Sequence, residues 1–127
     1  MTIGECIDRA DRICKNGVEP DMKVNMLSEL DQKLYHMVFL AHEGEFAEFS
    51  GYDENTGDDT ELLIPSPWDH LYVDYLIMRI AQIANEAGRY NNARAVFEEK
   101  MTEFRSWYTR THVPKRGASV RYWGGAR

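Results

Sequence analysis

Long apolar runs are absent from this sequence, and none approaches the ~20 residues that a membrane-spanning helix requires. The first residues also lack a basic stretch followed by an apolar one, which is the pattern of a secretory signal. Cysteine is scarce, because only Cys6 and Cys14 occur, and neither belongs to a CxxC pair. Their spacing on one helix corresponds to about 12 Å, which is too far for a disulfide. We therefore expect a cytosolic protein without membrane contact, whose cysteines are small apolar side chains.

Residue patterns that carry chemistry are also missing. The four histidines form no HExxH pair, and no cysteine stands at a zinc-binding distance from them. No glycine pattern matches a phosphate-binding loop, and no serine lies in a nucleophile elbow. Residues 53–59 resemble a calcium loop, but Gly57, Asp58 and Ile64 occupy positions where an EF-hand needs an oxygen ligand, a glycine and a glutamate. The sequence predicts neither an enzyme nor a cofactor or metal site.

The charges that are present are unevenly distributed. The net charge of −6 argues against nucleic-acid binding, which requires clustered lysine and arginine. One stretch, called here the acidic segment, contains acids and no lysine or arginine: Glu45, Glu48, Asp53, Glu54, Asp58, Asp59 and Glu61. After Glu103 every charged residue is basic. In a ring of identical subunits, an acidic patch on one copy can face a basic segment of the next.

The first half of the chain predicts two helices. Thr2 and Glu5 form a capping box that starts a helix over residues 3–14. Pro20 suits the first turn of a second helix, which Gly44 is expected to end. The polar residues between the apolar positions of this second helix are expected to face solvent: Ser28, Glu29, Asp31, Gln32 and Lys33.

The second half predicts two more helices. Ser66 as N-cap, Pro67 in the first turn and Asp69 at the positive helix end mark the start of a helix that stops near Ala87. Its apolar residues lie on more than one side, which indicates a central helix. A fourth helix is expected from Asn91 or Asn92, and its apolar stripe consists of Ala93, Phe97, Met101, Phe104 and Tyr108.

The junction between these two helices is rich in polar residues: Asn85, Glu86, Arg89, Tyr90 and Asn91. A catalytic interpretation would make Glu86 a base, but nothing nearby supplies a nucleophile or an oxyanion donor. We interpret the group as a structural corner with an ion pair between Glu86 and Arg89.

Two segments fall outside the helices. Residues 45–64 have the composition of a loop, in which residues 61–64 are expected to form a short strand that pairs with residues 46–50. Residues 111–127, the C-terminal arm, contain glycine and basic residues beside one aromatic pair. The expected fold is mainly α: a bundle of about four helices over residues 1–110, with an inserted acidic loop or short β-hairpin and an extended C-terminal arm.

Several stretches resemble a pattern common in prophage structural genes: residues 60–72 (TELLIPSPWDHLY), 84–86, 89–92 and 107–114 (WYTRTHVP), with residues 26–31 and 42–44 upstream. By this resemblance the chain is similar to the head–tail connectors, or neck adaptors, of tailed phages. The resemblance implies a structural virion protein that assembles in the host cytoplasm. Its copies would form a twelve-fold ring beneath the portal and leave a channel for genome DNA, which passes without sequence-specific binding.

The resemblance also implies partners for particular segments. The C-terminal arm would bind the portal protein, through Lys115, Arg116, Arg121, Tyr122 and Trp123. The acidic segment would face the channel or the neighbouring copy, and the next neck or tail-completion protein would bind below. The alternatives are a head-closure or tail-completion protein, a prophage-encoded helical regulator that binds DNA, an enzyme, or a helical domain of another purpose.

Overall fold

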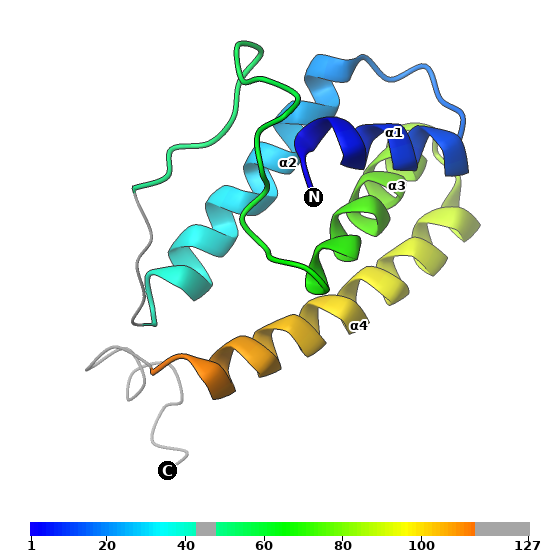
Figure 1. The fold of residues 1–127 in the computed structure, drawn as a ribbon. Helices are drawn as coiled ribbons and strands as arrows, with labels where there is room; N and C mark the ends of the chain where they lie inside the picture. Colours follow the sequence, from blue (N-terminus) through cyan, green and yellow to red (C-terminus); the bar gives the residue numbers. More distant parts are fainter. Residues whose placement is uncertain (43–47, 114–127) are drawn as a thin grey trace.

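The computed structural model describes residues 1–42 and 48–113. Helices dominate this part of the chain, which confirms the predicted mainly α fold (Figure 1). In chain order the helical elements are α1 (Ile3–Ile13), α2 (Pro20–Leu34), the π-helical η1 (Tyr35–Phe39), the 3-10 turn η2 (Trp68–His70), α3 (Leu71–Ile83) and α4 (Ala87–Thr111).

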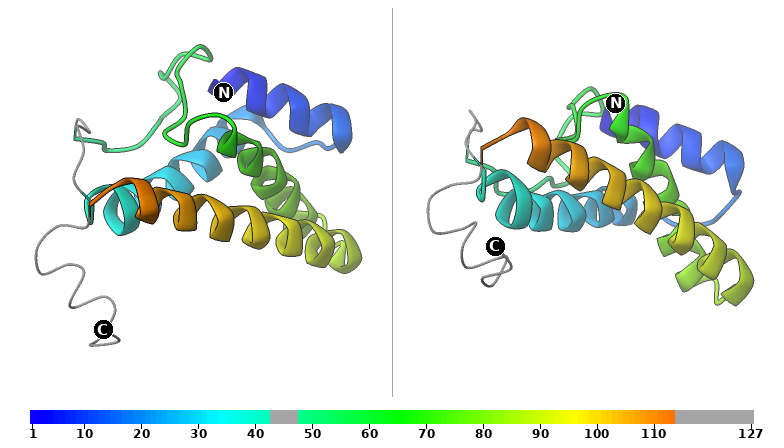
Figure 2. Two further views of the ribbon diagram at one scale, coloured as in Figure 1. Left: turned by 60° about the horizontal axis from the view of Figure 1, so that its bottom comes forward. Right: turned by 90° about the horizontal axis from the view of Figure 1, so that it is seen from below.

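Helix α3 is central, as its apolar residues on several sides predict. It contacts α1, α2 and α4, and it forms an antiparallel hairpin with the long α4 (Figure 2). The apolar stripe of α4 faces this core, because Phe104 and Tyr108 are buried while Phe97 and Met101 are partly buried against it. The core therefore lies between α3 and the elements on its flanks.

The predicted start of α1 is confirmed. The backbone N–H of Glu5 donates to Thr2 Oγ1 at 3.1 Å, and the N–H of Thr2 donates to Glu5 Oε1 at 2.9 Å. Pro20 occupies the first turn of α2, also as predicted. The helical path that begins there ends at Phe39 within η1, earlier than the expected end at Gly44, which lies outside the described residues.

The predicted cap of the third helix is wrong. The Ser66–Pro67 peptide bond is cis, and the chain enters α3 through η2, so that His70 and not Ser66 precedes the helix. Asp69 is buried and accepts a hydrogen bond from the amino group of Met1 at 2.8 Å. Its charge therefore stabilises the packed start of the chain, which the sequence pattern does not show.

The boundary between α3 and α4 also differs from the prediction. Helix α3 ends at Ile83 and α4 begins at Ala87, where Asn91 or Asn92 was expected. Asn85 adopts a left-handed conformation with φ of 59°. The N–H of Glu86 donates to the carbonyl of Ala81 at 2.9 Å, which is the capping pattern that glycine usually provides. Asn85 takes this role three residues before Gly88, so the turn is earlier and tighter than predicted.

The predicted hairpin does not form in the described residues. Glu61 pairs instead with Thr2 in an isolated antiparallel bridge. The N–H of Leu62 donates to the carbonyl of Met1 at 3.0 Å, and the N–H of Ile3 donates to the carbonyl of Thr60 at 2.9 Å. Residues 48–50 lie in no strand, and residues 46–47 fall outside the described part. The extended residues near Glu61 therefore find their hydrogen bonds at the N-terminus.

Candidate functional surfaces

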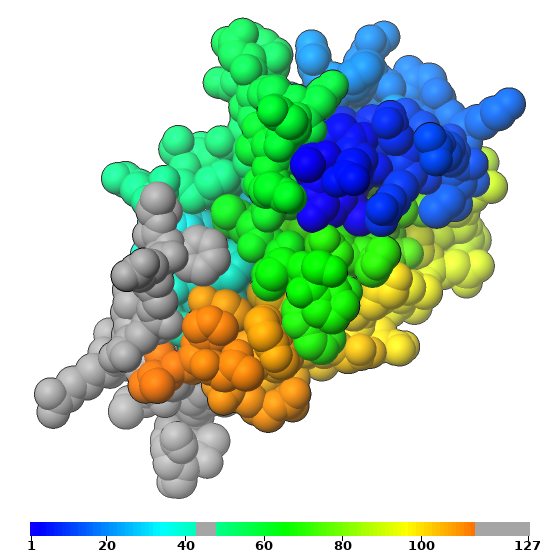
Figure 3. Space-filling model, in the orientation of Figure 1, coloured from blue at the N-terminus to red at the C-terminus, as the bar shows by residue number. Residues whose placement is uncertain are grey.

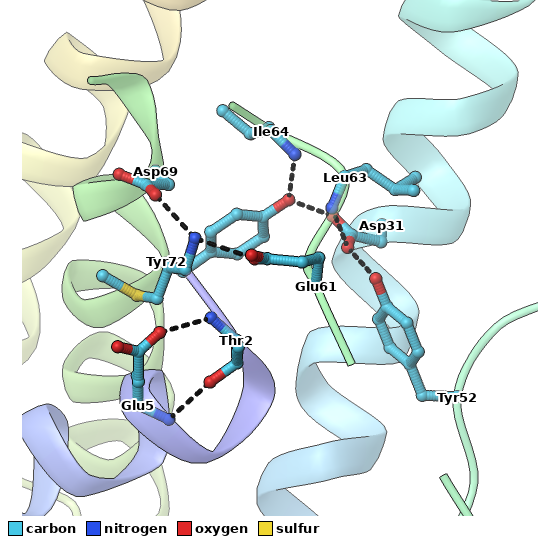
Figure 4. A network of polar contacts seen from close by, with 10 residues as sticks. Thr2, Glu5, Asp31, Tyr52, Glu61, Leu63, Ile64, Asp69 and Tyr72 are labelled. Atoms are coloured by element: carbon cyan, nitrogen blue, oxygen red, sulfur yellow. Dashed lines mark hydrogen bonds and ion pairs between the residues drawn. The ribbon is translucent and has the colours of Figure 1, made fainter. Parts of the chain in front are cut away.

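A buried carboxylate organises the loop that carries the acidic segment. Asp31 of α2 was expected to face solvent, but it is fully buried. It accepts hydrogen bonds from the hydroxyls of Tyr52 and Tyr72, each at 2.5 Å, and from the N–H of Leu63 at 3.2 Å (Figure 4). We call these four residues the Asp31 cluster. It joins α2 and α3 to both halves of the loop between them.

Two further side chains of α2 hold the same loop. Ser28, also expected in solvent, is buried and accepts a hydrogen bond from the N–H of Tyr52 at 2.9 Å. Gln32 donates to the carbonyl of Ser50 at 2.7 Å. Gly51 lies between these contacts with φ of +107°, and a Cβ there would stand 2.6 Å from Ser28 Oγ. The loop therefore approaches α2 so closely that only glycine fits.

The electrostatics of the Asp31 cluster follow from burial. Burial raises the pKa of Asp31, although the hydrogen bonds from Tyr52, Tyr72 and Leu63 oppose this change. Burial and the nearby carboxylate also raise the pKa of both tyrosine hydroxyls, which keeps them protonated as donors. The polar groups of the cluster are hydrogen-bonded to one another, so the role of the cluster is to stabilise the fold.

The raised pKa of Asp31 predicts how stability depends on pH. A carboxyl group whose pKa is higher in the folded state stabilises the fold below its unfolded pKa of 3.8, and this contribution is lost as pH rises through the folded value. Asp31→Asn cannot ionise. We therefore expect the free energy of unfolding of the wild type, minus that of Asp31→Asn, to increase as pH falls from about 7 to about 4. Urea titrations at several pH values measure this difference, and a difference that grows with rising pH would contradict the prediction.

The N-terminus completes the attachment of the loop. The amino group of Met1 lies 2.8 Å from Asp69 Oδ2 and 3.1 Å from Glu61 Oε2 (Figure 4). Burial lowers the pKa of this amino group, but the hydrogen bonds with Asp69 and Glu61 outweigh burial and leave the pKa raised. The group therefore stays charged, and Glu61, one member of the acidic segment, has a structural partner.

The acidic segment is thus displayed on a fixed loop. Its described members are all exposed: Glu48, Asp53, Glu54, Asp58, Asp59 and Glu61. The loop covers the start of α1 and one side of α2, and Figure 3 shows it as a ridge beside α1. Glu45 lies outside the described residues. The ridge therefore presents negative charge on a backbone that hydrogen bonds to α1 and α2 hold in place.

The residues predicted to bind the portal lie outside the described part of the chain: Lys115, Arg116, Arg121, Tyr122 and Trp123. The structure does show where the C-terminal arm begins. His112 stacks on Tyr108 with ring centroids 3.8 Å apart, and Trp107 lies 5.4 Å from Trp68. The arm therefore leaves the bundle from an aromatic cluster at the end of α4.

The polar corner lies at the opposite end of α4. Glu86 and Arg89 form the predicted ion pair at 3.2 Å, and Arg89 also donates to Cys14 Sγ at 3.0 Å. Asn85 forms the turn, while Tyr90 and Asn91 belong to the first turns of α4. The pair is largely exposed, and its contact with Cys14 ties the α3–α4 turn to the end of α1.

Beside this corner is a groove of about 360 Å³. It lies between the α1–α2 connection and the end of α3, and its apolar lining is Cys14, Val18, Met22, Ile80, Ile83 and Ala84. Lys15, Glu19 and Glu86 supply charge at its edge. No sequence pattern predicted this groove, because its two walls come from segments 58 or more residues apart, counted from Met22 to Ile80.

The described residues contain no group of three or more histidine, cysteine or acidic side chains arranged to hold a metal ion. Within the same residues, no helix is both long enough and apolar enough to cross a membrane. Comparison of the chain with family models, curated proteins and solved structures finds no match.

Proposed function

We propose that this protein is a structural virion protein, a head–tail adaptor whose copies form a ring beneath the portal of a tailed phage. The observation that supports it best is the separation of charge along the chain. Exposed acids occupy the fixed loop over α1 and α2, while the charged residues of the sequence after Glu103 are all basic. A subunit that carries opposite charges at different places can join unlike surfaces in a fixed order.

The same proposal assigns a partner to each charged part. The C-terminal arm, with Lys115, Arg116 and the aromatic pair Tyr122 and Trp123, binds the portal protein, because large aromatics beside positive charge make strong contacts. The acidic segment faces the neighbouring copy or the DNA channel, where negative charge keeps DNA from adhering. The next neck or tail protein binds the remaining face of the ring. The resemblance of residues 60–72 and 107–114 to prophage structural proteins supports this assignment.

Sedimentation with the purified portal ring of the same genome tests the proposal. The full chain should bind saturably, with a stoichiometry that reports the number of adaptors in the ring. A chain that ends at Thr111 keeps all of α4 but loses the arm, and we expect its affinity to fall by at least about a hundredfold, or ~2.7 kcal/mol. Arm charge and arm aromatics contribute together to this loss.

A matched pair of full-length variants separates the arm from net charge. The double variant Lys115→Glu, Arg116→Glu should weaken portal binding. The double variant Arg12→Glu, Lys15→Glu changes the net charge by the same amount, on exposed residues of the N-terminal region, and should leave portal binding unchanged. If neither the full chain nor the truncated chain sediments with the portal, the direct contact is excluded. Binding to a tail-side ring instead would favour a tail-completion protein, and a salt-dependent gel shift with DNA would favour the regulator.

A further inference from the structure

Among the described residues, the hydroxyl of Tyr108 is the one buried side-chain polar atom that has no hydrogen-bond partner. Tyr108 belongs to the last turn of α4 and is only 3% exposed. By contrast, the buried hydroxyls of Tyr52 and Tyr72 both donate to Asp31. Burial raises the pKa of Tyr108, so its hydroxyl stays protonated and can donate a hydrogen bond. Tyr108 therefore holds a donor that the fold itself does not use.

A hydroxyl without a partner lowers the stability of the protein that buries it. Burial removes the hydrogen bonds that the group makes with water, and here no protein acceptor replaces them. Phenylalanine would fill the same space without this cost. Unsatisfied buried groups are rare in folded proteins, and departures from the rules of stability are typical of functional sites. The hydroxyl of Tyr108 therefore points to an acceptor that arrives with a partner.

The residues around Tyr108 connect it to the start of the C-terminal arm. His112, which follows the last residue of α4, stacks on the tyrosine ring with centroids 3.8 Å apart. Phe39 and His42 also contact this ring, edge to face, at 5.1 and 5.3 Å. The next residue of the arm, Val113, is 63% exposed. A partner that draws the arm away from the bundle therefore moves His112, which is part of the cover of Tyr108.

The charged residues of this end of α4 favour an anionic acceptor. Arg110, two residues after Tyr108, is exposed, and Arg105, three residues before it, is half-buried. Glu103 is the last acid of the sequence, so no acid follows it in α4 or in the arm. A carboxylate is attracted to such a basic surrounding and accepts strong hydrogen bonds from phenolic hydroxyls, as Asp31 does twice in this structure.

We propose that Tyr108 is a portal-binding residue, whose hydroxyl donates a hydrogen bond to a carboxylate of the portal protein. The bond forms when the C-terminal arm docks and His112 moves with it, so that the carboxylate reaches the hydroxyl beside Arg110. This inference rests on the proposed adaptor function and extends the portal contact from the arm into the last turn of α4. The free protein then carries an unsatisfied hydroxyl because the hydrogen bond belongs to the assembled particle.

Tyr108→Phe in the full chain separates this role from a structural one, because it should not lower stability although it weakens binding. The variant should melt at the temperature of the wild type or up to about 5 °C higher, since it removes only an unsatisfied hydroxyl. Its affinity for the purified portal ring, measured by sedimentation, should fall at least about tenfold. Arg110→Gln should also weaken portal binding at an unchanged melting temperature, because the acceptor is a carboxylate.

The control is Tyr90→Phe, which removes the hydroxyl of a half-buried tyrosine near the other end of α4. It should melt and bind the portal like the wild type. A lower melting temperature for Tyr108→Phe would overturn the proposal, because the hydroxyl would then already have a partner in the free protein, such as an ordered water. Wild-type portal binding by Tyr108→Phe would reject this contact alone, whereas a wild-type chain that does not bind the portal would reject the adaptor function and the contact together.

Discussion

With alanine in place of Asp31, the free energy of unfolding is expected to fall by about 3–5 kcal/mol. The carboxylate is fully buried and accepts hydrogen bonds from Tyr52, Tyr72 and Leu63. Alanine leaves these three donors without an acceptor in a site that water does not reach, and each unsatisfied buried group costs about 1–3 kcal/mol. Urea denaturation followed by circular dichroism measures the change.

Two controls isolate the role of the Asp31 carboxylate. Asp31→Asn keeps one acceptor oxygen in the same place. Its free energy of unfolding should therefore fall by less than that of Asp31→Ala, by about 1–2 kcal/mol. Asp21→Ala removes an exposed carboxylate from the first turn of the same helix and should change stability by less than about 1 kcal/mol. A loss for Asp31→Ala no larger than that for Asp21→Ala would show that the Asp31 cluster does not hold the loop.

Replacing Phe104 with alanine is the second change with a large expected effect, a loss of about 3–5 kcal/mol. Phe104 is fully buried, and its ring lies 6.2 Å from that of Phe39 and 5.8 Å from that of Tyr108. The contact with Phe39 joins the C-terminal half of α4 to η1. Alanine leaves a cavity where the two elements meet, and the rigid surroundings close it only in part.

Phe104→Leu retains most of the apolar volume, so we expect its free energy of unfolding to fall by only about 1–1.5 kcal/mol. Phe97→Ala, on the same stripe but only partly buried, should lose less than Phe104→Ala. Thermal and chemical denaturation of the three variants rank the losses. Equal losses for Phe97→Ala and Phe104→Ala would contradict the central place of Phe104.

The sequence was sufficient for those features that depend on near neighbours. The capping box of Thr2 and Glu5, the apolar stripe of α4 and the ion pair between Glu86 and Arg89 all join residues within a few positions. The turn between α3 and α4 was misplaced, because Asn85, and not the later Gly88, follows α3 in the left-handed conformation. A local pattern indicates a turn, but it does not choose between two residues that both tolerate the left-handed region.

The Asp31 cluster was missed although the sequence holds a signal for it. Asp31 stands four residues after Leu27 and three before Leu34, on the apolar side of α2. A polar residue at such a position needs buried partners. Its partners Tyr52 and Tyr72 lie 21 and 41 residues away, and no local rule pairs residues at those distances. The groove could not be predicted for the same reason, whereas the role of the C-terminal arm stays a prediction.

The long reach of the Asp31 cluster also sets an order of events during synthesis. The ribosome completes α2 well before it adds Tyr72, so the nascent chain at first has a carboxylate on the apolar side of a helix with no hydroxyl to meet it. Before α3 emerges, only Tyr52 and Leu63 can donate to this carboxylate, so one of its three hydrogen bonds is still missing. The first half of the polypeptide therefore cannot complete the Asp31 cluster alone, because the last donor, Tyr72, arrives only with α3.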